Sequence, residues 1–183
     1  MPLYTHRLSR REFLVVAGAT GAGAAALLIV GCGGDGESDV AVLSYARQRI
    51  ASLGELSEGE PLSFAFPSEG QRNFLIKLGE AANGGVGPDG DVVAFSYLCT
   101  HMGCPLVGQY KNEYKILGPC PCHFSTFDLR TNGMVVLGQA TENLPQIMLS
   151  VEGDDVFATG VMGVFYGVGN NLRDAGVAAE AAS

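Results

Sequence analysis

The chain has 183 residues, of which 47% are hydrophobic, enough to bury the core of one domain with additional segments at its ends. Its formal net charge is -8 at pH 7, with 11 Lys and Arg against 19 Asp and Glu. This balance argues against a nucleic-acid partner, because binding phosphates requires a surface rich in Lys and Arg. The 26 glycines, with short apolar runs between them, indicate strands and loops rather than long helices.

Residues 1–31 have the features of an export leader. Arg10 and Arg11 shortly precede an apolar stretch over residues 13–30 that is rich in Gly and Ala. A charged start before an apolar run is typical of exported proteins, and the arginine pair resembles a twin-arginine signal. We therefore expect export to the periplasm. The alternative is that the run stays as a membrane anchor, since about 18 residues just reach across a bilayer.

Cys32 directly follows residues 28–31, Leu-Ile-Val-Gly, and this arrangement resembles a lipoprotein cleavage box. Lipidation of Cys32 would attach the mature N-terminus to a membrane. The alternative is that Cys32 is removed with the leader. Residues 33–39 are rich in Gly, Asp and Ser, so we expect a linker over residues 32–44.

Residues 45–170 contain many short strand-like runs with turn sequences such as Thr131-Asn132-Gly133 between them. The strands are expected, in chain order, at 45–50, 62–66, 74–78, 92–96, 114–117, 125–128, 134–136, 147–151, 156–159 and 164–166. This spacing predicts an all-β domain, built as a sandwich or barrel. The Ala-rich residues 171–183 are expected to form a tail, to which we assign no function.

The chemistry is concentrated between residues 99 and 123, which hold all but one of the cysteines and two of the three histidines. Residues 99–104 read Cys-Thr-His-Met-Gly-Cys, and residues 120–125 read Cys-Pro-Cys-His-Phe-Ser. Each box offers a Cys/His pair and one further Cys. A structural zinc site usually takes Cys pairs spaced two to four apart or two His on a helix, whereas here a Cys-x-His loop is matched to a Cys-x-x-His loop. Zinc would also leave two cysteines unexplained. A thioredoxin-like site needs two residues between its cysteines, and here Pro121 stands alone.

The two boxes resemble those of Rieske iron–sulfur proteins. The resemblance implies a [2Fe–2S] cluster, one per chain, with one iron on the cysteines and the other on the histidines: Cys99 and Cys120, His101 and His123. It also implies a disulfide between Cys104 and Cys122, the two cysteines that the cluster leaves over. The implied fold is an antiparallel β-sandwich with a small cluster-binding part of loops and short strands at about residues 97–140.

This ligand set has an electrostatic consequence. Two ferric ions, two sulfides and two thiolates sum to zero charge, whereas four thiolates leave a charge of -2. Rieske centres as a class accordingly reach about -150 to +300 mV, against about -400 mV for plant-type ferredoxins. High-potential Rieske proteins of cytochrome bc complexes carry a Ser after the second box and a Tyr two residues later. Here Ser125 is present but Phe127 replaces the Tyr, so one hydrogen-bond donor is lost and we expect a more moderate potential.

Within the Rieske proteins, the small subunit of arsenite oxidase is the nearest resemblance. It implies a large catalytic subunit that carries molybdopterin and a further iron–sulfur cluster and oxidises arsenite to arsenate. This chain would relay the electrons to a periplasmic cytochrome c or cupredoxin. The alternatives are the very similar small subunit of iodate reductase, the Rieske subunit of a cytochrome bc complex, and a Rieske ferredoxin.

Two further segments are expected near the cluster. Residues 138–145 lie where Rieske proteins have a third loop over the cluster, with Gln139 where Pro is usual. Apolar residues around the boxes are expected either to dock a partner or to pack against the cluster: Met102, Pro105, Leu106 and Phe124.

Overall fold

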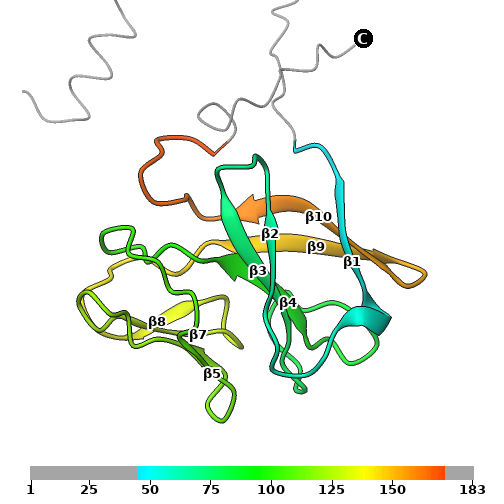
Figure 1. Ribbon diagram of the computed structural model, residues 1–183, viewed down its shortest axis with the longest axis horizontal. Coiled ribbons are helices and arrows are strands. Elements are labelled where there is room, and N and C mark those ends of the chain that lie inside the picture. Colours follow the sequence, from blue (N-terminus) through cyan, green and yellow to red (C-terminus); the bar gives the residue numbers. More distant parts are fainter. Residues whose placement is uncertain (1–44, 172–183) are drawn as a thin grey trace, which may run out of the picture. The chain divides into compact units, whose positions relative to one another are not determined.

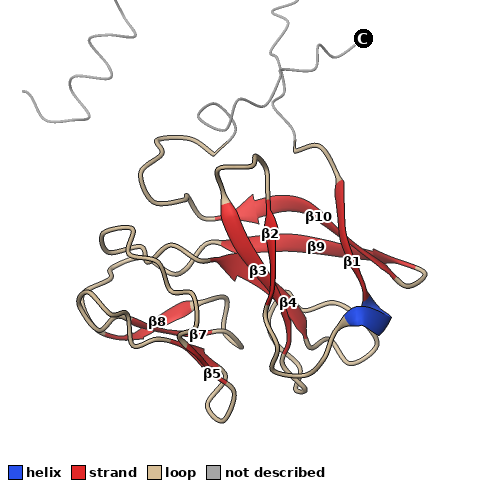
Figure 2. Cartoon of the chain, in the orientation of Figure 1, coloured by secondary structure: helices blue, strands red, loops and turns tan. Residues whose placement is uncertain are grey.

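The computed structural model describes residues 45–171, so the expectations for Arg10, Arg11 and Cys32 lie outside the described residues. The described part is nearly all β, as predicted, with one short 3-10 turn, η1 (Leu53–Glu55) (Figures 1 and 2). The strands are β1 (Gln48–Ser52), β2 (Leu62–Ala65), β3 (Arg72–Lys77), β4 (Val92–Ser96), β5 (Tyr110–Lys111), β6 (Ile116–Leu117), β7 (Thr126–Asp128), β8 (Met134–Leu137), β9 (Gln146–Glu152) and β10 (Asp155–Met162).

Six strands form the larger sheet in the order β1-β10-β9-β4-β3-β2, and every neighbouring pair is antiparallel. Strand β4 is buried along its whole length because both of its faces are covered. Val93 and Phe95 point into one hydrophobic core, whereas Val92 and Ala94 point into the other. A strand covered on both faces is apolar without alternation, which explains the Val-Val-Ala-Phe run.

The smaller sheet has the order β5-β6-β7-β8 and is made of strands of two to four residues. Its Leu117 and Phe127 pack with Phe74 and Phe95 of the larger sheet in one continuous core. Cys99 and Cys120 belong to the same core. The cysteines therefore rest on the packed junction of the two sheets rather than on a free loop.

The strand predicted at residues 164–166 is wrong. After β10, Gly163 takes a φ of +92° and the chain leaves the sheet. Phe165 is buried, but its main-chain N–H donates to Asn171 Oδ1 at 2.9 Å instead of to a strand. The apolar character of this segment thus reflects burial of one ring, not a sheet position.

The strand predicted at residues 114–117 is correct only in its second half. Strands β5 and β6 form a tight hairpin, and the connecting turn includes Lys115 with a φ of +53°. The 3-10 turn η1 was not expected from the sequence. Within residues 45–171, no helix has the length and apolar character needed to cross a membrane.

Candidate metal centre

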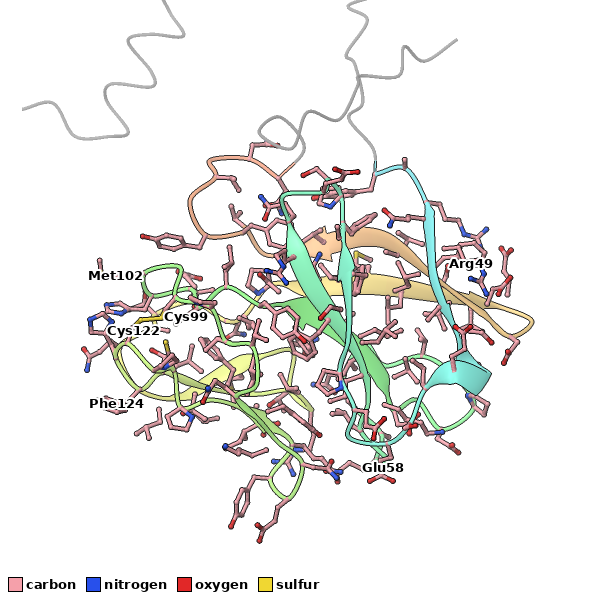
Figure 3. All side chains as sticks on the ribbon, in the orientation of Figure 1. Arg49, Glu58, Cys99, Met102, Cys122 and Phe124 are labelled. Carbon is pink, nitrogen blue, oxygen red and sulfur yellow. A yellow bond between two sulfur atoms is a disulfide. The ribbon has the colours of Figure 1, made fainter. Side chains whose placement is uncertain are left out.

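Both boxes lie in loops at one end of the domain. The first box follows β4, and the second lies between β6 and β7. Figure 3 shows Cys99, Met102, Cys122 and Phe124 gathered at this end, on the side away from Arg49. The two sheets therefore bring together residues about 20 apart in sequence, because β4 and the β6–β7 hairpin share the core beneath them.

The two loops are closed by the same main-chain pattern. In the first, Cys99 N–H donates to Cys104 O at 2.9 Å and Gly103 N–H donates to Cys99 O at 2.8 Å. In the second, Cys120 N–H donates to Ser125 O at 2.8 Å and Phe124 N–H donates to Cys120 O at 2.9 Å. The fifth residue of each loop has a positive φ, +69° at Gly103 and +63° at Phe124. The leading cysteine of each box is thus held in an equivalent local geometry.

The four cysteines divide into a bonded pair and a free pair. Cys104 and Cys122 are joined by a disulfide with a Cα–Cα distance of 6.4 Å, which ties the two loops together. Cys99 and Cys120 are free thiols, each 1% exposed, and their sulfurs are in hydrogen-bond contact. The sulfurs of Cys104, Cys120 and Cys122 lie within 4.8 Å of one another, but a disulfide supplies no thiolate. The free pair is the one able to bind a metal.

The environment of Cys99 favours the neutral thiol until a metal binds. Burial is the main cause that raises the pKa of Cys99, and the adjacent Cys120 sulfur acts in the same direction. Hydrogen bonds from the His101 main chain and the Ser125 hydroxyl lower the pKa, but they do not outweigh burial. A bound cation would replace the proton and receive a thiolate already supplied with two hydrogen bonds.

The two histidine rings lie against each other, and each belongs to the same box as one of the free thiols. The His101 and His123 rings are 4.7 Å apart between centroids and meet edge to face at 88°. His101 Nδ1 is buried and has no hydrogen-bond partner within residues 45–171. Buried imidazole nitrogens normally have a hydrogen-bond partner, so one without a partner is expected where the nitrogen binds a metal. Two buried thiols and two imidazoles on adjoining loops fit a centre with mixed Cys and His ligands.

The Ser125 hydroxyl connects the second box to the third loop. Ser125 is fully buried, and its Oγ accepts hydrogen bonds from Gln139 N–H at 3.1 Å and Ala140 N–H at 3.0 Å. A hydroxyl has two acceptor lone pairs and one donor, so these bonds leave its proton for the Cys99 sulfur. Ser125 therefore connects the third loop to the Cys99 thiol, in an orientation that the two main-chain bonds fix.

Gly138 and Thr100 hold the third loop against both boxes; the loop at residues 138–145 was expected from the sequence, but these two contacts were not. A Cβ on Gly138 would lie 2.3 Å from Ser125 Cα, and its φ of +100° also favours glycine. The Thr100 hydroxyl donates to the Glu142 main-chain oxygen at 2.7 Å. Segment 138–145 thus adjoins both boxes. A glycine at the end of a strand was the available signal for Gly138, whereas the Thr100 contact had none.

The apolar residues around the boxes are of two kinds. Leu106 and Phe127 are fully buried in the core beneath the cysteines. Met102 and Phe124 are 59% and 67% exposed, and Pro105 is exposed as well. Only the second group is available to a partner protein.

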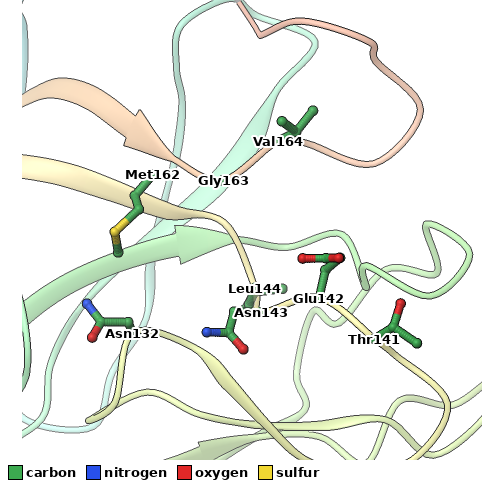
Figure 4. A pocket seen from close by; sticks show the side chains of 8 residues that line it. All are labelled: Asn132, Thr141, Glu142, Asn143, Leu144, Met162, Gly163 and Val164. Atoms are coloured by element: carbon green, nitrogen blue, oxygen red, sulfur yellow. The ribbon is translucent and has the colours of Figure 1, made fainter. Parts of the chain in front are cut away.

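A groove of about 690 Å³ runs beside the third loop (Figure 4). Its lining includes Asn132, Leu144 and Met162, and Glu142 is its one ionisable side chain. The groove is thus lined mainly by uncharged side chains.

The comparisons with known proteins agree with this centre. The Rieske [2Fe-2S] domain family matches residues 46–148, which include both boxes. The chain therefore belongs to the Rieske [2Fe–2S] family, and its domain carries a [2Fe–2S] cluster. It is 53% identical to the iodate reductase subunit IdrB of Pseudomonas sp. (strain SCT), over 87% of this chain and 82% of that protein. It is 48% identical to iodate reductase subunit IdrB of Denitromonas iodatirespirans, over 90% of this chain and 86% of that protein.

Among solved structures, the soluble domain of the Rieske protein II (soxF) from Sulfolobus acidocaldarius matches with a TM-score of 0.61 and 26% identity. The match covers 68% of this chain and 82% of that one. The fold and the family are thus established together, and the chain is an electron-transfer subunit of an oxidoreductase.

Proposed function

We propose that this chain is the electron-transfer subunit of a molybdenum oxidoreductase of the iodate reductase type. The observation that carries the proposal is the identity of about one residue in two with two iodate reductase subunits over nearly the whole of each chain. The sequence resembles the small subunits of both arsenite oxidase and iodate reductase. These relatives favour the iodate reductase alternative over the arsenite oxidase interpretation.

We further propose that the cluster is bound by the two free thiols and the two imidazoles: Cys99, Cys120, His101 and His123. The support is their burial, their mutual contacts and the unpartnered Nδ1 of His101. A bound [2Fe–2S] cluster accepts and releases one electron at a time. The residues of this chain hold that electron away from water on the cysteine side, while His123 stays exposed toward a partner.

The iodate reductase type reverses the direction of electron flow relative to arsenite oxidation. This chain would receive electrons from a periplasmic cytochrome c or cupredoxin and deliver them to a large subunit. That subunit would hold molybdopterin and a further iron–sulfur cluster, and would reduce iodate there. The proposal includes export to the periplasm, because Arg10 and Arg11 resemble a twin-arginine signal, and membrane attachment if Cys32 is lipidated or the leader is retained.

One experiment separates the two substrates. The native complex is isolated, its iron, sulfide, zinc and molybdenum are measured, and the EPR signal of this chain is followed. Iodate added to the reduced complex should reoxidise the Rieske centre within seconds to minutes, and arsenite added to the oxidised complex should leave it oxidised. Reduction by arsenite would restore the arsenite oxidase interpretation. A complex that contains haems b and c and oxidises quinol would refute both interpretations in favour of a cytochrome bc complex. Zinc in place of iron would refute the cluster itself.

A further inference from the structure

The second box contains a strained residue that the domain itself does not explain. Phe124 has a φ of +63°, in the left-handed region that side chains with a Cβ disfavour. The equivalent residue of the first box is Gly103, where the ring of Tyr166 would lie 2.3 Å from a Cβ. The second box places a phenylalanine at the same turn, yet its side chain is 67% exposed and joins neither hydrophobic core. Such strain at an exposed position indicates a benefit outside the domain.

Phe124 lies beside the imidazole that is most open to a partner. It directly follows His123, which is exposed, while His101 is half-buried. Met102 occupies the first box on the other side of the disulfide and is 59% exposed. Leu137 pairs with Thr126 at the end of β8 and is 65% exposed. We call these three exposed apolar residues, Met102, Phe124 and Leu137, the apolar tip.

The segments that form the apolar tip carry no charge. Residues 93–110, 116–127 and 131–141 contain no Asp, Glu, Lys or Arg, although the chain as a whole has a net charge of -8. Glu142 is the charged residue that the third loop adds next to them. Charged side chains such as Arg49 and Glu58 lie elsewhere, toward the right and the bottom of Figure 3.

The absence of charge decides which kind of partner fits. Transient redox partners find each other through complementary charges, which raise the association rate. Permanent subunit interfaces are instead depleted in charged residues at their centre and enriched in aromatic residues and Met. Phe, Met and Leu around an uncharged tip therefore match a permanent subunit better than a soluble carrier.

We propose that the apolar tip is the contact surface for the catalytic subunit, and that the Phe124 ring inserts into an apolar pocket on it. This inference rests on the proposed function, since it takes the large subunit as the occupant. The second-box loop requires a left-handed main chain at this position, which glycine would adopt without strain. A phenylalanine stands there instead because its ring contacts the partner.

The test uses Phe124→Gly in the full chain and in its complex with the catalytic subunit. The variant relieves the strain, so the melting temperature of the free chain should rise by about 2–4 °C with iron content unchanged. The dissociation constant of the complex should rise at least about tenfold, as for loss of a central aromatic contact. Phe124→Tyr should retain most of the affinity. Met148→Ala, which truncates a residue 56% exposed on β9, should leave the affinity unchanged.

The outcomes separate the surface from the function. A purely structural role of Phe124 predicts that Phe124→Gly lowers the melting temperature and leaves the affinity unchanged. That result would refute the contact surface but not the proposed function. The same holds if Phe124→Gly slows only the reaction with the soluble carrier while the complex keeps its affinity. A wild-type chain that isolates without a molybdenum subunit would overturn the proposed function, and the apolar tip with it.

Discussion

Replacing Ser125 by Ala tests how the third loop acts on the cluster. The hydroxyl accepts two main-chain N–H groups, from Gln139 and Ala140, and has one proton left for the Cys99 sulfur. Removal leaves two main-chain N–H groups without an acceptor, at a cost of about 1–3 kcal/mol for each donor that is buried. Because the Gln139 contact is only partly buried, we expect the free energy of unfolding to fall by about 2–4 kcal/mol.

The same substitution should lower the reduction potential. A hydrogen bond to a charged group contributes about 1.5–3 kcal/mol, and part of this is gained only when the cluster takes an electron and becomes more negative. If about 1–2 kcal/mol of it favours the reduced state, the one-electron relation of about 59 mV per factor of ten gives a fall of about 40–90 mV.

The assay is a redox titration of the purified holoprotein, followed by EPR, together with urea unfolding. The matched control is Ser96→Ala, which also removes a buried serine that accepts a main-chain N–H, here from Leu98 at 3.1 Å. Ser96→Ala should lower stability and leave the potential unchanged. An unchanged potential in Ser125→Ala, or an equal shift in both variants, would show that the hydroxyl does not donate to the sulfur.

Three other predictions concern stability. Gly138→Ala places a Cβ against the second box and should lower the free energy of unfolding in urea by more than about 3 kcal/mol. The control Gly153→Ala is also at positive φ but in open space, so it should lower this free energy by only about 1–2 kcal/mol. Equal losses in the two variants would refute the close-contact argument. Loss of the disulfide in the double variant Cys104→Ser, Cys122→Ser should reduce stability by about 3 kcal/mol, measured under oxidising conditions, because the bond closes a loop of 18 residues. Burial, with smaller contributions from two acidic side chains, raises the pKa of Tyr110 to about 12. Its folded-state pKa exceeds the unfolded value near 10, so its stabilising contribution is complete below pH 10 and is lost toward pH 12; Tyr110→Phe should therefore lose less stability over this range in alkaline denaturation.

The fold could be predicted where burial determined the sequence pattern. The strand expected at residues 92–96 coincides with β4, since a strand covered on both faces must be apolar throughout. The strand expected at 164–166 failed because Val, Phe and Tyr favour strands by composition, while the neighbouring Gly163 and Gly167 turn the chain with positive φ. The composition of three residues cannot reveal that the Asn171 side chain, rather than a neighbouring strand, forms hydrogen bonds with the main chain of Phe165 and Gly163.

The metal centre was predictable to the extent that it is local in sequence. The resemblance of the two boxes implied the disulfide between Cys104 and Cys122, which the structure contains, and it also predicts the four cluster ligands. The contacts that fix their surroundings are non-local: Thr100 reaches Glu142 across 42 residues, and Ser125 reaches Ala140 across 15. No periodicity or motif encodes such pairs, because they depend on how the β8–β9 connection folds back over the loops.

The difficulty of choosing between arsenite oxidation and iodate reduction from this chain has a physical cause. The residues that surround the centre hold one electron in the same way whether it arrives from the catalytic subunit or leaves toward it. Direction is set by the difference in potential between adjacent centres, and only one of those centres lies here. We predict that Ser125 raises the potential by donating to a sulfur and that Phe127, which is fully buried and has no donor, limits it. On this prediction the chain adjusts only the size of one step. On the function proposed above, the substrate is therefore chosen in the large subunit, and this chain would contribute to specificity only through the apolar tip by which it binds that subunit.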